Sequence, residues 1–510
     1  MGQPGRVLVI AGSDNSGGAG LEADQKVIAA HGCYAQTATT ALTAQDTKGV
    51  YDVHHTPPQF LDKLIDLGFG DVGVDVVKTG MLASAETIRT VAAALERHAG
   101  PKVVVDPVMV ATSGATLLPR EAVRELLGGL LPRTTVLTPN IPEAKMLLAE
   151  AGREAVEVRG VEDFETIAKQ ARALGPEWVL VKGGHAPLDK TYKIASTDED
   201  KAVVVDVLCG PEDVIYRIES PFQESKHTHG TGCSLASAIA SNLAKGLDVP
   251  QAVKKAVRYI EAAIRTAPGF GQGHGPLNHF HSNYNLPFAP GRFIEYLLER
   301  PDVKDVWKTF VYHPFVMALG NGTLPLESFK GYLIQDYLYL VHFARANALA
   351  SYKAKNLDDI VAGATIVQHI AREMSLHIDY CAGFGISVPE IEATEEKQAC
   401  TAYTRYVLDV GQSEDWIALQ MALAPCLLGY GAVAQQLHAD AASVRGDGNR
   451  YWNWIENYVA EDYVGAVRIG SALLERHAAL QSPSSIERLV KIFIHGTKME
   501  IGFWEMFPHE

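Results

Sequence analysis

The sequence has no excess of positive charge and few cysteines. Its 45 lysines and arginines are outnumbered by 60 aspartates and glutamates, which gives a formal net charge of −15. This balance argues against a surface for nucleic acid or an anionic membrane, so we expect neither partner. The six cysteines show no C-x-x-C spacing. We therefore expect reduced thiols, a reducing compartment and a cytoplasmic location.

Long apolar runs are also scarce. Residues 1–6 lead directly into a predicted strand, so no signal or transit peptide is expected. Residues 416–434 are nearly free of charge but include Gln420, Pro425 and Gly429, and no aromatic belt flanks them. This composition favours a buried core helix over a membrane span.

At 510 residues the chain is too long for one hydrophobic core. From residue 6 to about 267, short β-rich runs alternate with helical patterns such as 86–98, 120–127 and 164–174. Continuous apolar strands separated by helices indicate a mostly parallel sheet covered on both faces. The predicted strands are Val7–Ala11, Val74–Lys78, Val103–Asp106, Val136–Thr138, Trp178–Lys182 and Val203–Leu208.

The pattern changes after residue 267. Residues 268–291 are rich in Gly, His, Asn and Pro and predict a linker. Long helices with a 3.6-residue apolar period follow, and they predict an all-α bundle over residues 292–510. The predicted helices are Phe293–Arg300, Val303–Tyr312, Leu326–Ala354, Leu357–Cys381, Glu395–Val410, Asp415–Leu437, Tyr451–Ala479 and Pro483–Phe507.

The most informative stretch is H-T-H-G-T-G-C-S at residues 227–234. Glycines and small hydroxyl residues lead into an apolar helix, and a helix start of this kind favours an anion. A thiol at this place, Cys233, is expected to have a lowered pKa. Alone, however, the pattern is better explained as a glycine-rich helix start with a buried cysteine.

Other motifs follow predicted strands. The loop A-G-S-D-N-S-G-G-A-G at 11–20 is glycine-rich but has neither a following Gly-Lys-[Ser/Thr] nor G-x-G-x-x-G. K-T-G-M, D-P-V-M, T-P-N-I-P-E and V-K-G-G-H lie at strand ends, the edge where open α/β sheets collect ligands. Asn140 and Glu143 supply oxygens suited to Mg²⁺. Asp24 and Gln45 either bind a small heterocycle or cap helices.

Together these motifs resemble the hydroxymethylpyrimidine and hydroxymethylpyrimidine-phosphate kinases of the ribokinase-like superfamily. The resemblance implies an α/β three-layer fold over residues 1–267 and ATP- and Mg²⁺-dependent phosphorylation of a pyrimidine alcohol and then of its monophosphate. It assigns pyrimidine contacts to Gly12, Asp24, Gln45, Met81 and Val108, the metal to Asn140 and Glu143, nucleotide contacts to Lys182 and Gly184, and an anion hole to Gly230, Thr231 and Gly232.

Most members of that superfamily have Asp where this chain has Cys233. A monophosphate acceptor is already anionic at neutral pH and hardly needs a general base. Cys233 is therefore expected to act mainly in the first phosphorylation, or to shape the site.

In the second half, three reactive side chains occupy apolar helical stripes. At about 100° per residue, Asp336, Glu500 and Cys426 each share a face with aromatic or aliphatic residues. Any one of them alone is explained by a structural hydrogen bond, but together they predict a polar pocket inside the bundle. Its chemistry would be attack by Cys426, with one carboxylate orienting the substrate and the other moving protons.

H-P-F-V-x-x-L-G, Q-D-Y-x-Y-L, A-x-A-P-C and E-x-x-F-W resemble the thiaminase II family, the aminopyrimidine aminohydrolases. The resemblance implies an all-α heme-oxygenase-like fold, a homo-oligomer (dimer or tetramer) and no cofactor. Cys426 would add to the ring, Asp336 would hold its amino edge, and Glu500 would act as general acid and base. The residues expected to shape and stack the site are Tyr339, Tyr403, Tyr430, Tyr458 and Phe503.

The product of the second reaction would be the substrate of the first, so we expect a bifunctional thiamin biosynthesis or salvage enzyme acting on small pyrimidines. Two alternatives remain open. The helical domain is a non-catalytic binding or oligomerisation module, or the first domain is a pyridoxal-type kinase.

Overall fold

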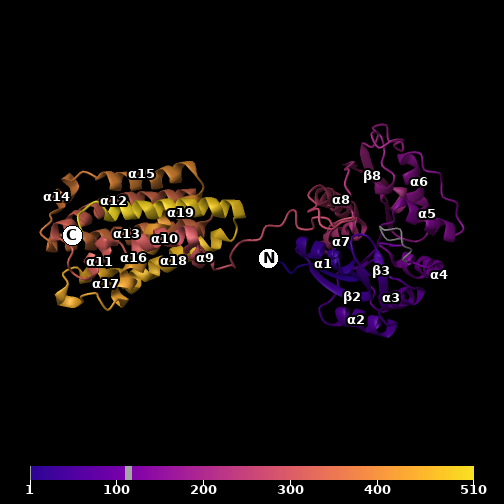
Figure 1. Cartoon of the computed structure of the whole chain (residues 1–510), viewed down its shortest axis with the longest axis horizontal. Coiled ribbons are helices and arrows are strands. Elements are labelled where there is room, and N and C mark those ends of the chain that lie inside the picture. The colour runs from indigo at the N-terminus through magenta and orange to yellow at the C-terminus, as the bar shows by residue number, and fades with distance from the viewer. Residues whose placement is uncertain (1, 110–117, 510) are drawn as a thin grey trace. The chain divides into compact units, whose positions relative to one another are not determined.

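The computed structural model describes residues 2–109 and 118–509, apart from the side chains of residues 373, 376 and 377. The chain divides into two compact units, Met1–Asn283 and Tyr284–Glu510 (Figure 1). Each unit is described separately below.

The first unit is built on one sheet, nine-stranded over the described residues, with the strand order β3-β2-β1-β4-β5-β6-β7-β8-β9. The strands from β2 to β7 pair in parallel, while β3, β8 and β9 are antiparallel additions at the two edges. The strands are β1 (Arg6–Asp14), β2 (Tyr34–Gln45), β3 (Val50–His55), β4 (Val76–Thr79), β5 (Lys102–Val105), β6 (Val136–Leu137), β7 (Trp178–Val181), β8 (Val203–Cys209) and β9 (Ile215–Pro221).

Successive side chains of a strand point to opposite faces of the sheet, so continuously apolar strands give the sheet two buried faces. Val7 and Val9 of β1 pack in one core, and Leu8 and Ile10 pack in the other. Helices cover both faces, which confirms the predicted three-layer α/β fold. The first core includes α1 (Gly20–Ala30), α7 (Thr231–Ala244) and α8 (Val249–Arg265); the second includes α2 (Pro58–Gly70), α3 (Ala85–Arg97), α4 (Arg120–Glu125), α5 (Ile141–Glu150) and α6 (Val161–Arg172).

Three strands, β2, β3 and β9, are absent from the sequence prediction. The pattern of β2 is dominated by Ala and Thr, and β3 and β9 are largely exposed strands with charged or histidine side chains. A strand that does not bury a continuous apolar face lacks the signal on which the prediction depended.

The segment expected as a linker, 268–291, contributes its first half to the first unit. Leu277 is 2% exposed and joins the core around α7 and α8. The Tyr259 hydroxyl donates to the backbone carbonyl of His279 at 2.6 Å. These contacts extend the compact unit to Asn283. The sequence did not indicate this boundary, because the few buried side chains lie in a polar, glycine-rich segment.

The second unit is helical, as predicted, and its long helices surround α16. Within the described residues, α16 alone is long and apolar enough to cross a membrane, but 83% of its most apolar window is buried inside the unit. The helices are α9 (Phe293–Glu299), α10 (Pro301–Val311), α11 (Pro314–Gly320), α12 (Leu326–Lys353), α13 (Leu357–Gly383), α14 (Val388–Ala393), α15 (Gln398–Ser413), α16 (Trp416–Ala439), α17 (Trp452–Val459), α18 (Glu461–Ala478) and α19 (Pro483–Trp504).

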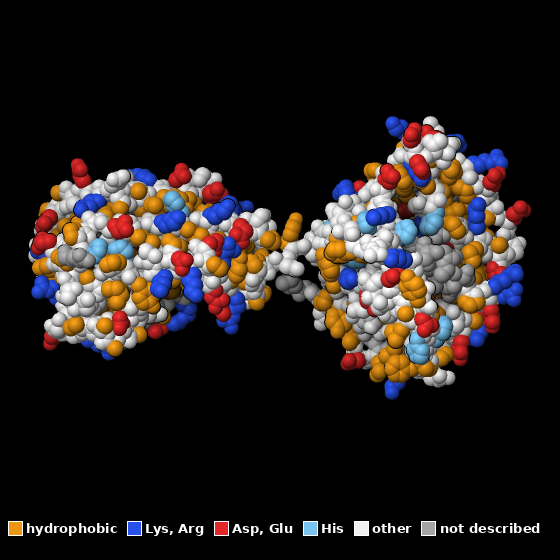
Figure 2. Space-filling view, in the orientation of Figure 1, with side chains coloured by type: hydrophobic (Ala, Val, Ile, Leu, Met, Phe, Trp, Pro, Cys, Tyr) orange, Lys and Arg blue, Asp and Glu red, His pale blue; other side chains and the backbone are white. Residues whose placement is uncertain are grey.

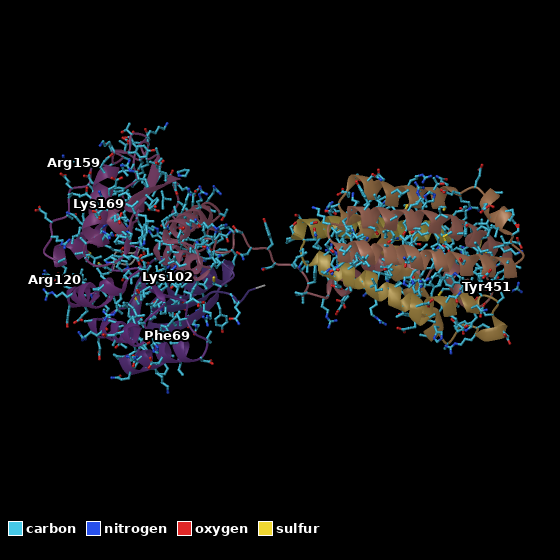
Figure 3. All side chains as sticks on the ribbon, turned by 180° about the vertical axis from the view of Figure 1, so that it is seen from behind. Phe69, Lys102, Arg120, Arg159, Lys169 and Tyr451 are labelled. Carbon is cyan, nitrogen blue, oxygen red and sulfur yellow. The ribbon has the colours of Figure 1, made fainter. Side chains whose placement is uncertain are left out.

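Two details of the helical unit differ from the prediction. The single helix expected over 451–479 is broken at Ala460, whose ψ of 151° is extended and separates α17 from α18. Tyr451, labelled in Figure 3, precedes α17 and donates its hydroxyl to the Leu324 carbonyl at 2.5 Å. The short helices α11 and α14 were not predicted, because six or seven residues are too few to show a helical period.

Charges of both signs are interspersed on the visible face of each unit (Figure 2). This mixture agrees with the composition of the sequence, which has 45 basic and 60 acidic residues.

Phe164 on α6 is fully buried in the larger core of the first unit, whereas Phe60 on α2 is 55% exposed. Phe164→Ala should destabilise this unit by about 3–5 kcal/mol, the usual cost of emptying a buried aromatic site. Scanning calorimetry of the whole chain should show a lowered transition for the first unit only, with Phe60→Ala close to wild type. Equal effects of the two substitutions would contradict this description of the core.

Candidate functional site

A buried cluster of charge lies at the carboxyl edge of the sheet, where β5, β6 and β7 end. The Lys182 ammonium lies 3.0 Å from a carboxylate oxygen of Asp106 and 3.9 Å from one of Glu143. Burial lowers the pKa of Lys182, but these two carboxylates more than offset it and raise the pKa above its ordinary value. The ammonium is therefore charged and faces the edge where the sequence motifs predicted a ligand.

Asn140 and Glu143, the predicted metal pair, form a capping box at the start of α5. The Asn140 side-chain oxygen accepts from the Glu143 backbone N–H, and a Glu143 carboxylate oxygen accepts from the Asn140 N–H, both at 2.8 Å. In the part of the chain that the structure describes, no three His, Cys, Asp or Glu side chains are grouped to hold a metal ion. The oxygens of Glu143, Asn140 and Asp106 still suit Mg²⁺, which keeps most of its waters and binds through one or two carboxylates plus phosphate.

The turn at residues 227–234 leads into α7 beside this cluster. Gly230 has φ +78°, and a Cβ there would lie 1.8 Å from the Gly18 carbonyl oxygen, so only glycine fits. Thr231 is the first residue of α7. A Cβ on Gly232 would lie 3.1 Å from the Lys182 nitrogen. The helix start and the Lys182 ammonium thus border the same small space, which suits an anion, although the Thr231 N–H donates to the Thr228 carbonyl at 3.2 Å.

Cys233 corrects one expectation. Burial raises the pKa of its thiol to about 11, although the Lys78 ammonium acts in the opposite direction. The lowered pKa expected for this thiol is therefore wrong, because loss of water around the sulfur outweighs the effect of the nearby Lys78 ammonium. At neutral pH the group is a thiol, not a thiolate.

Asp24, expected to bind the pyrimidine, is hydrogen-bonded to other groups of the first unit. Both of its carboxylate oxygens lie within 2.9 Å of the Lys78 ammonium, and one also accepts from the Ser237 hydroxyl at 2.7 Å. Both side chains of the ion pair are 0% exposed. These bonds occupy the carboxylate beneath the site, so its geometry points to holding β4, α1 and α7 together rather than to direct contact with a pyrimidine.

The remaining predicted pyrimidine residues lie on neighbouring elements. A Cβ on Gly12 would lie 2.3 Å from the terminal methyl of Met81, so these two residues are in contact. Val108 lines a small cavity together with Gly80 and Asp106. Gln45 ends β2, and its amide lies 3.1 Å from His229.

Gly184, expected near the nucleotide, is exposed in the short turn Gly183–His185 directly after Lys182. This turn is fixed by the Gly183 N–H, which donates to the buried Asp206 carboxylate at 2.8 Å. The exposed backbone of Gly184 leaves room for a ligand above Lys182.

In the second unit, the two carboxylates on apolar stripes are buried as predicted. Asp336 on α12 accepts from the Tyr332 hydroxyl at 3.3 Å, and Glu500 on α19 accepts from the Tyr403 hydroxyl at 2.8 Å. Burial raises the pKa of Asp336 to about 7 and that of Glu500 to about 8. Both groups thus titrate near neutral pH, where a catalytic acid or base is most effective.

Aromatic rings connect these carboxylates to Cys426 on α16. Burial raises the pKa of the Tyr339 phenol, and the Cys426 side chain lies close enough to raise the pKa of Tyr339, Tyr403 and Tyr430 further. The Tyr339 and Tyr403 rings stack with centroids 4.8 Å apart, and Phe503 meets Tyr339 edge-on at 5.7 Å. Tyr458 packs against Tyr430 at 5.3 Å. All the side chains predicted for this site therefore occupy one region of the bundle.

Four further residues belong to the two sites. Lys78 and Asp106 belong to the sequence motifs K-T-G-M and D-P-V-M. The motifs alone did not indicate that these two charged side chains are buried. Tyr332 is part of the apolar stripe around Asp336, where its hydroxyl had no predicted partner. His229 gave no signal beyond its place in T-H-G-T-G-C.

Comparison with known proteins agrees with both halves. Residues 14–278 match the family described as phosphomethylpyrimidine kinase, and residues 300–509 match the TENA/THI-4/PQQC family. The chain belongs to the phosphomethylpyrimidine kinases that carry a C-terminal TENA/THI-4 domain. The predicted family resemblance and the predicted fold class are thereby confirmed.

Three of the relatives match nearly the whole chain. A Schizosaccharomyces pombe protein named as a hydroxymethylpyrimidine/phosphomethylpyrimidine kinase is 42% identical over 98% of this chain and 90% of its own length. The Saccharomyces cerevisiae hydroxymethylpyrimidine/phosphomethylpyrimidine kinase THI20 is 35% identical over 98% of this chain and 94% of its own length. A Corynebacterium efficiens thiamine biosynthesis multifunctional protein, ThiED, is 31% identical over 98% of this chain and 69% of its own.

The raised pKa of Glu500 has a consequence for stability. In the folded state Glu500 keeps a proton up to about pH 8, whereas an unfolded glutamate releases it near 4.5. The free energy of unfolding of the helical unit should therefore fall as the pH rises through this window. In Glu500→Gln the unfolding temperature of this unit should fall less between about pH 5 and about pH 8 than in wild type.

The matched control is Glu505→Gln, at the exposed end of α19. It should keep the wild-type pH dependence in scanning calorimetry. Identical slopes in wild type and Glu500→Gln would mean that Glu500 is ionised throughout.

Proposed function

We propose that this chain is a bifunctional enzyme of thiamin biosynthesis or salvage. The first unit phosphorylates 4-amino-5-hydroxymethyl-2-methylpyrimidine and then its monophosphate, with ATP as donor. The second unit hydrolyses the related aminopyrimidine, 4-amino-5-aminomethyl-2-methylpyrimidine, and thiamin. The observation that carries the proposal is the presence on one chain of both matched families, each with buried carboxyl groups at its predicted site.

In the kinase unit, catalysis rests on neutralising the charge of the transferring phosphoryl group. The amides of Gly230, Thr231 and Gly232 would form the anion hole, and the Lys182 ammonium, 3.1 Å from a Cβ placed on Gly232, would lie against the phosphate oxygens. Gly184 would leave space for the nucleotide. Bound Mg²⁺, held through Asn140 and Glu143, would supply further positive charge beside the phosphates.

The acceptor would lie at the same sheet edge. Gln45 is proposed to hydrogen-bond the pyrimidine, while Gly12, Met81 and Val108 form the wall of its pocket. Asp24 is proposed to act beneath the site by fixing Lys78. The alcohol of the first acceptor must lose its proton during transfer, whereas the monophosphate is already an anion.

In the helical unit, the Cys426 sulfur is proposed to form a bond to the pyrimidine ring, with the Asp336 carboxyl on the amino edge of that ring. Glu500, protonated at neutral pH, would give its proton to the departing amine. Water then adds to the methylene and returns a proton to Glu500, and the ring–sulfur bond breaks to free the Cys426 sulfur. Tyr339, Tyr403, Tyr430, Tyr458 and Phe503 would enclose the ring and exclude other water.

The two reactions join because the hydroxymethylpyrimidine released by the second unit is the substrate of the first. We further propose a cytoplasmic homo-oligomer, either a dimer or a tetramer. The kinase domain is assigned to residues 1–267 together with the packed residues up to 283, and the aminohydrolase domain to residues 292–510.

Cys426→Ala should lower kcat for ammonia release from the aminopyrimidine by a factor on the order of 10³ or more, since no other group replaces the nucleophile. An ammonia assay measures this, phosphorylation of hydroxymethylpyrimidine by the same preparation should be unchanged, and a wild-type calorimetric transition of the helical unit controls for its folding. Equal ammonia release by variant and wild type would leave the helical unit without the proposed activity.

Cys233→Ala should separate the two phosphorylations. Because the thiol is protonated at neutral pH, only its small thiolate fraction can accept the proton of the alcohol, so its loss should lower kcat for the alcohol by no more than about tenfold and change kcat for the monophosphate by less than about twofold. Separate rate measurements with the alcohol and with its monophosphate check this. An equal loss with both acceptors would show that Cys233 acts in a step common to both transfers.

A further inference from the structure

The side chain of His229 lies between two loops that border the proposed pyrimidine pocket. Its Nε2 atom is 2.9 Å from an Asp14 carboxylate oxygen and 3.1 Å from the side-chain amide of Gln45. His229 is 7% exposed and Asp14 is 2% exposed. The histidine therefore contacts the residue proposed to bind the pyrimidine, but is itself enclosed by protein.

The hydrogen bonds of Asp14 determine which ring nitrogen carries the proton. Its carboxylate also accepts from the backbone N–H groups of Ser16, at 2.9 Å, and Ala19, at 2.8 Å. Burial acts against the charge, but the bonds from His229 and Ser16 hold the pKa of Asp14 below its ordinary value. An ionised carboxylate only accepts, so the Nε2 atom of His229 must carry hydrogen and donate it.

This assignment orients the Gln45 amide. The structure places the Gln45 Nε2 atom toward His229 and the Gln45 Oε1 atom 3.4 Å from the Thr43 hydroxyl. The two ends of an amide are assigned from their hydrogen bonds, and an Nε2–H of His229 repels an NH₂ group and attracts an oxygen. We therefore assign the reverse orientation, with the Gln45 oxygen toward His229. In this orientation the NH₂ group faces the Thr43 hydroxyl, which already donates to the Ser13 carbonyl at 2.8 Å. Such a hydroxyl has a lone pair to accept one N–H of Gln45.

The oriented amide leaves one N–H and one oxygen lone pair for a ligand. These two groups match an aminopyrimidine edge, in which an exocyclic NH₂ donates and the adjacent ring nitrogen accepts. A ligand whose ring presents a hydroxyl or aldehyde instead of this pair leaves one of the amide groups without a partner, which is costly in a closed site.

A glycine-rich segment, residues 269–276, holds both partners in place; we name it the glycine strap. The Gly273 N–H donates to the Thr47 hydroxyl at 3.1 Å, and the His274 N–H donates to the Thr47 carbonyl at 2.8 Å, two residues beyond Gln45. At its other end, the His229 N–H donates to the Gly275 carbonyl at 3.2 Å.

The strap must be glycine-rich to pack so closely. A Cβ on Gly273 would lie 2.1 Å from the Thr47 carbonyl oxygen, and one on Gly271 would lie 2.4 Å from the Thr47 side chain. The strap therefore ties the turn after Gln45 to the loop that carries His229, and it fixes the distance between the two side chains.

We propose that His229, held by Asp14 and the glycine strap, is a positioning residue that orients the Gln45 amide for an aminopyrimidine. The proposal rests on the proposed function, because it takes Gln45 as the pyrimidine-binding residue. His229 acts through Gln45 and makes no contact with the reacting atoms.

The test is a double-mutant cycle on the full chain, with KM for hydroxymethylpyrimidine and KM for ATP measured separately. His229→Ala should raise KM for the pyrimidine by about tenfold and leave KM for ATP within about twofold, which also reports an intact fold. In a Gln45→Ala background the same substitution should change KM for the pyrimidine by less than about twofold.

Two further variants keep the test decisive. His229→Gln retains an N–H near the position of Nε2 and should recover most of the pyrimidine affinity. Thr47→Val removes the acceptor of the Gly273 N–H. It should raise KM for the pyrimidine when Gln45 is present and leave KM unchanged in the Gln45→Ala background. His54→Ala on the exposed strand β3 is the control and should match wild type.

An equal effect of His229→Ala with and without Gln45 would overturn the proposal while leaving the kinase assignment intact. A rise in KM for ATP as large as that for the pyrimidine would also overturn it, since it would indicate a general collapse of the loops. A Gln45→Ala enzyme with unchanged pyrimidine KM would instead overturn the assignment of Gln45 itself, and the two failures are thus distinguishable.

Discussion

The Lys182 ammonium, enclosed by the carboxylates of Asp106 and Glu143, is the interaction on which the kinase unit depends. A charge removed from water must be paired, and each of these three groups follows a different strand of the sheet. The pairing brings the ends of β5, β6 and β7 to one point, and the start of α7 meets them there because Gly232 allows a close approach. The same arrangement holds the positive charge of Lys182 in a fixed place beside the start of α7.

In the helical unit the buried carboxyl groups have a different environment. Asp336 and Glu500 are buried, and tyrosine hydroxyls donate hydrogen bonds to them. Hydrogen bonds from neutral donors do not offset burial fully, so both carboxyls keep their protons to near neutral pH. A protonated carboxyl close to a cysteine suits the transfer of a proton to a leaving amine. The two units thus use buried carboxyl groups in two ways, as partners for ammonium groups and as acids.

Much of this was predictable from the sequence. Continuous apolar runs such as Val103–Asp106 predicted buried parallel strands, and reactive residues on apolar stripes predicted the site around Cys426. The missing strands β2, β3 and β9 lie where the sheet is exposed and apolar periodicity is weak. Likewise, a motif identifies Cys233 and Asp24 but not their surroundings, so the raised thiol pKa and the Asp24–Lys78 ion pair required the three-dimensional contacts. The glycine strap was predicted as part of a linker because of its composition, and its hydrogen bonds to Thr47 and His229 are visible only in the structure.

The central claim, that one chain converts an aminopyrimidine into a phosphorylated hydroxymethylpyrimidine, is tested most directly by product analysis. The full chain is supplied with 4-amino-5-aminomethyl-2-methylpyrimidine, ATP and Mg²⁺, and the products are identified by mass. The account predicts free ammonia and hydroxymethylpyrimidine diphosphate from wild type, and ammonia with unphosphorylated hydroxymethylpyrimidine from Lys182→Met. Phosphorylated product that retains the aminomethyl nitrogen, or no ammonia from wild type, would contradict it.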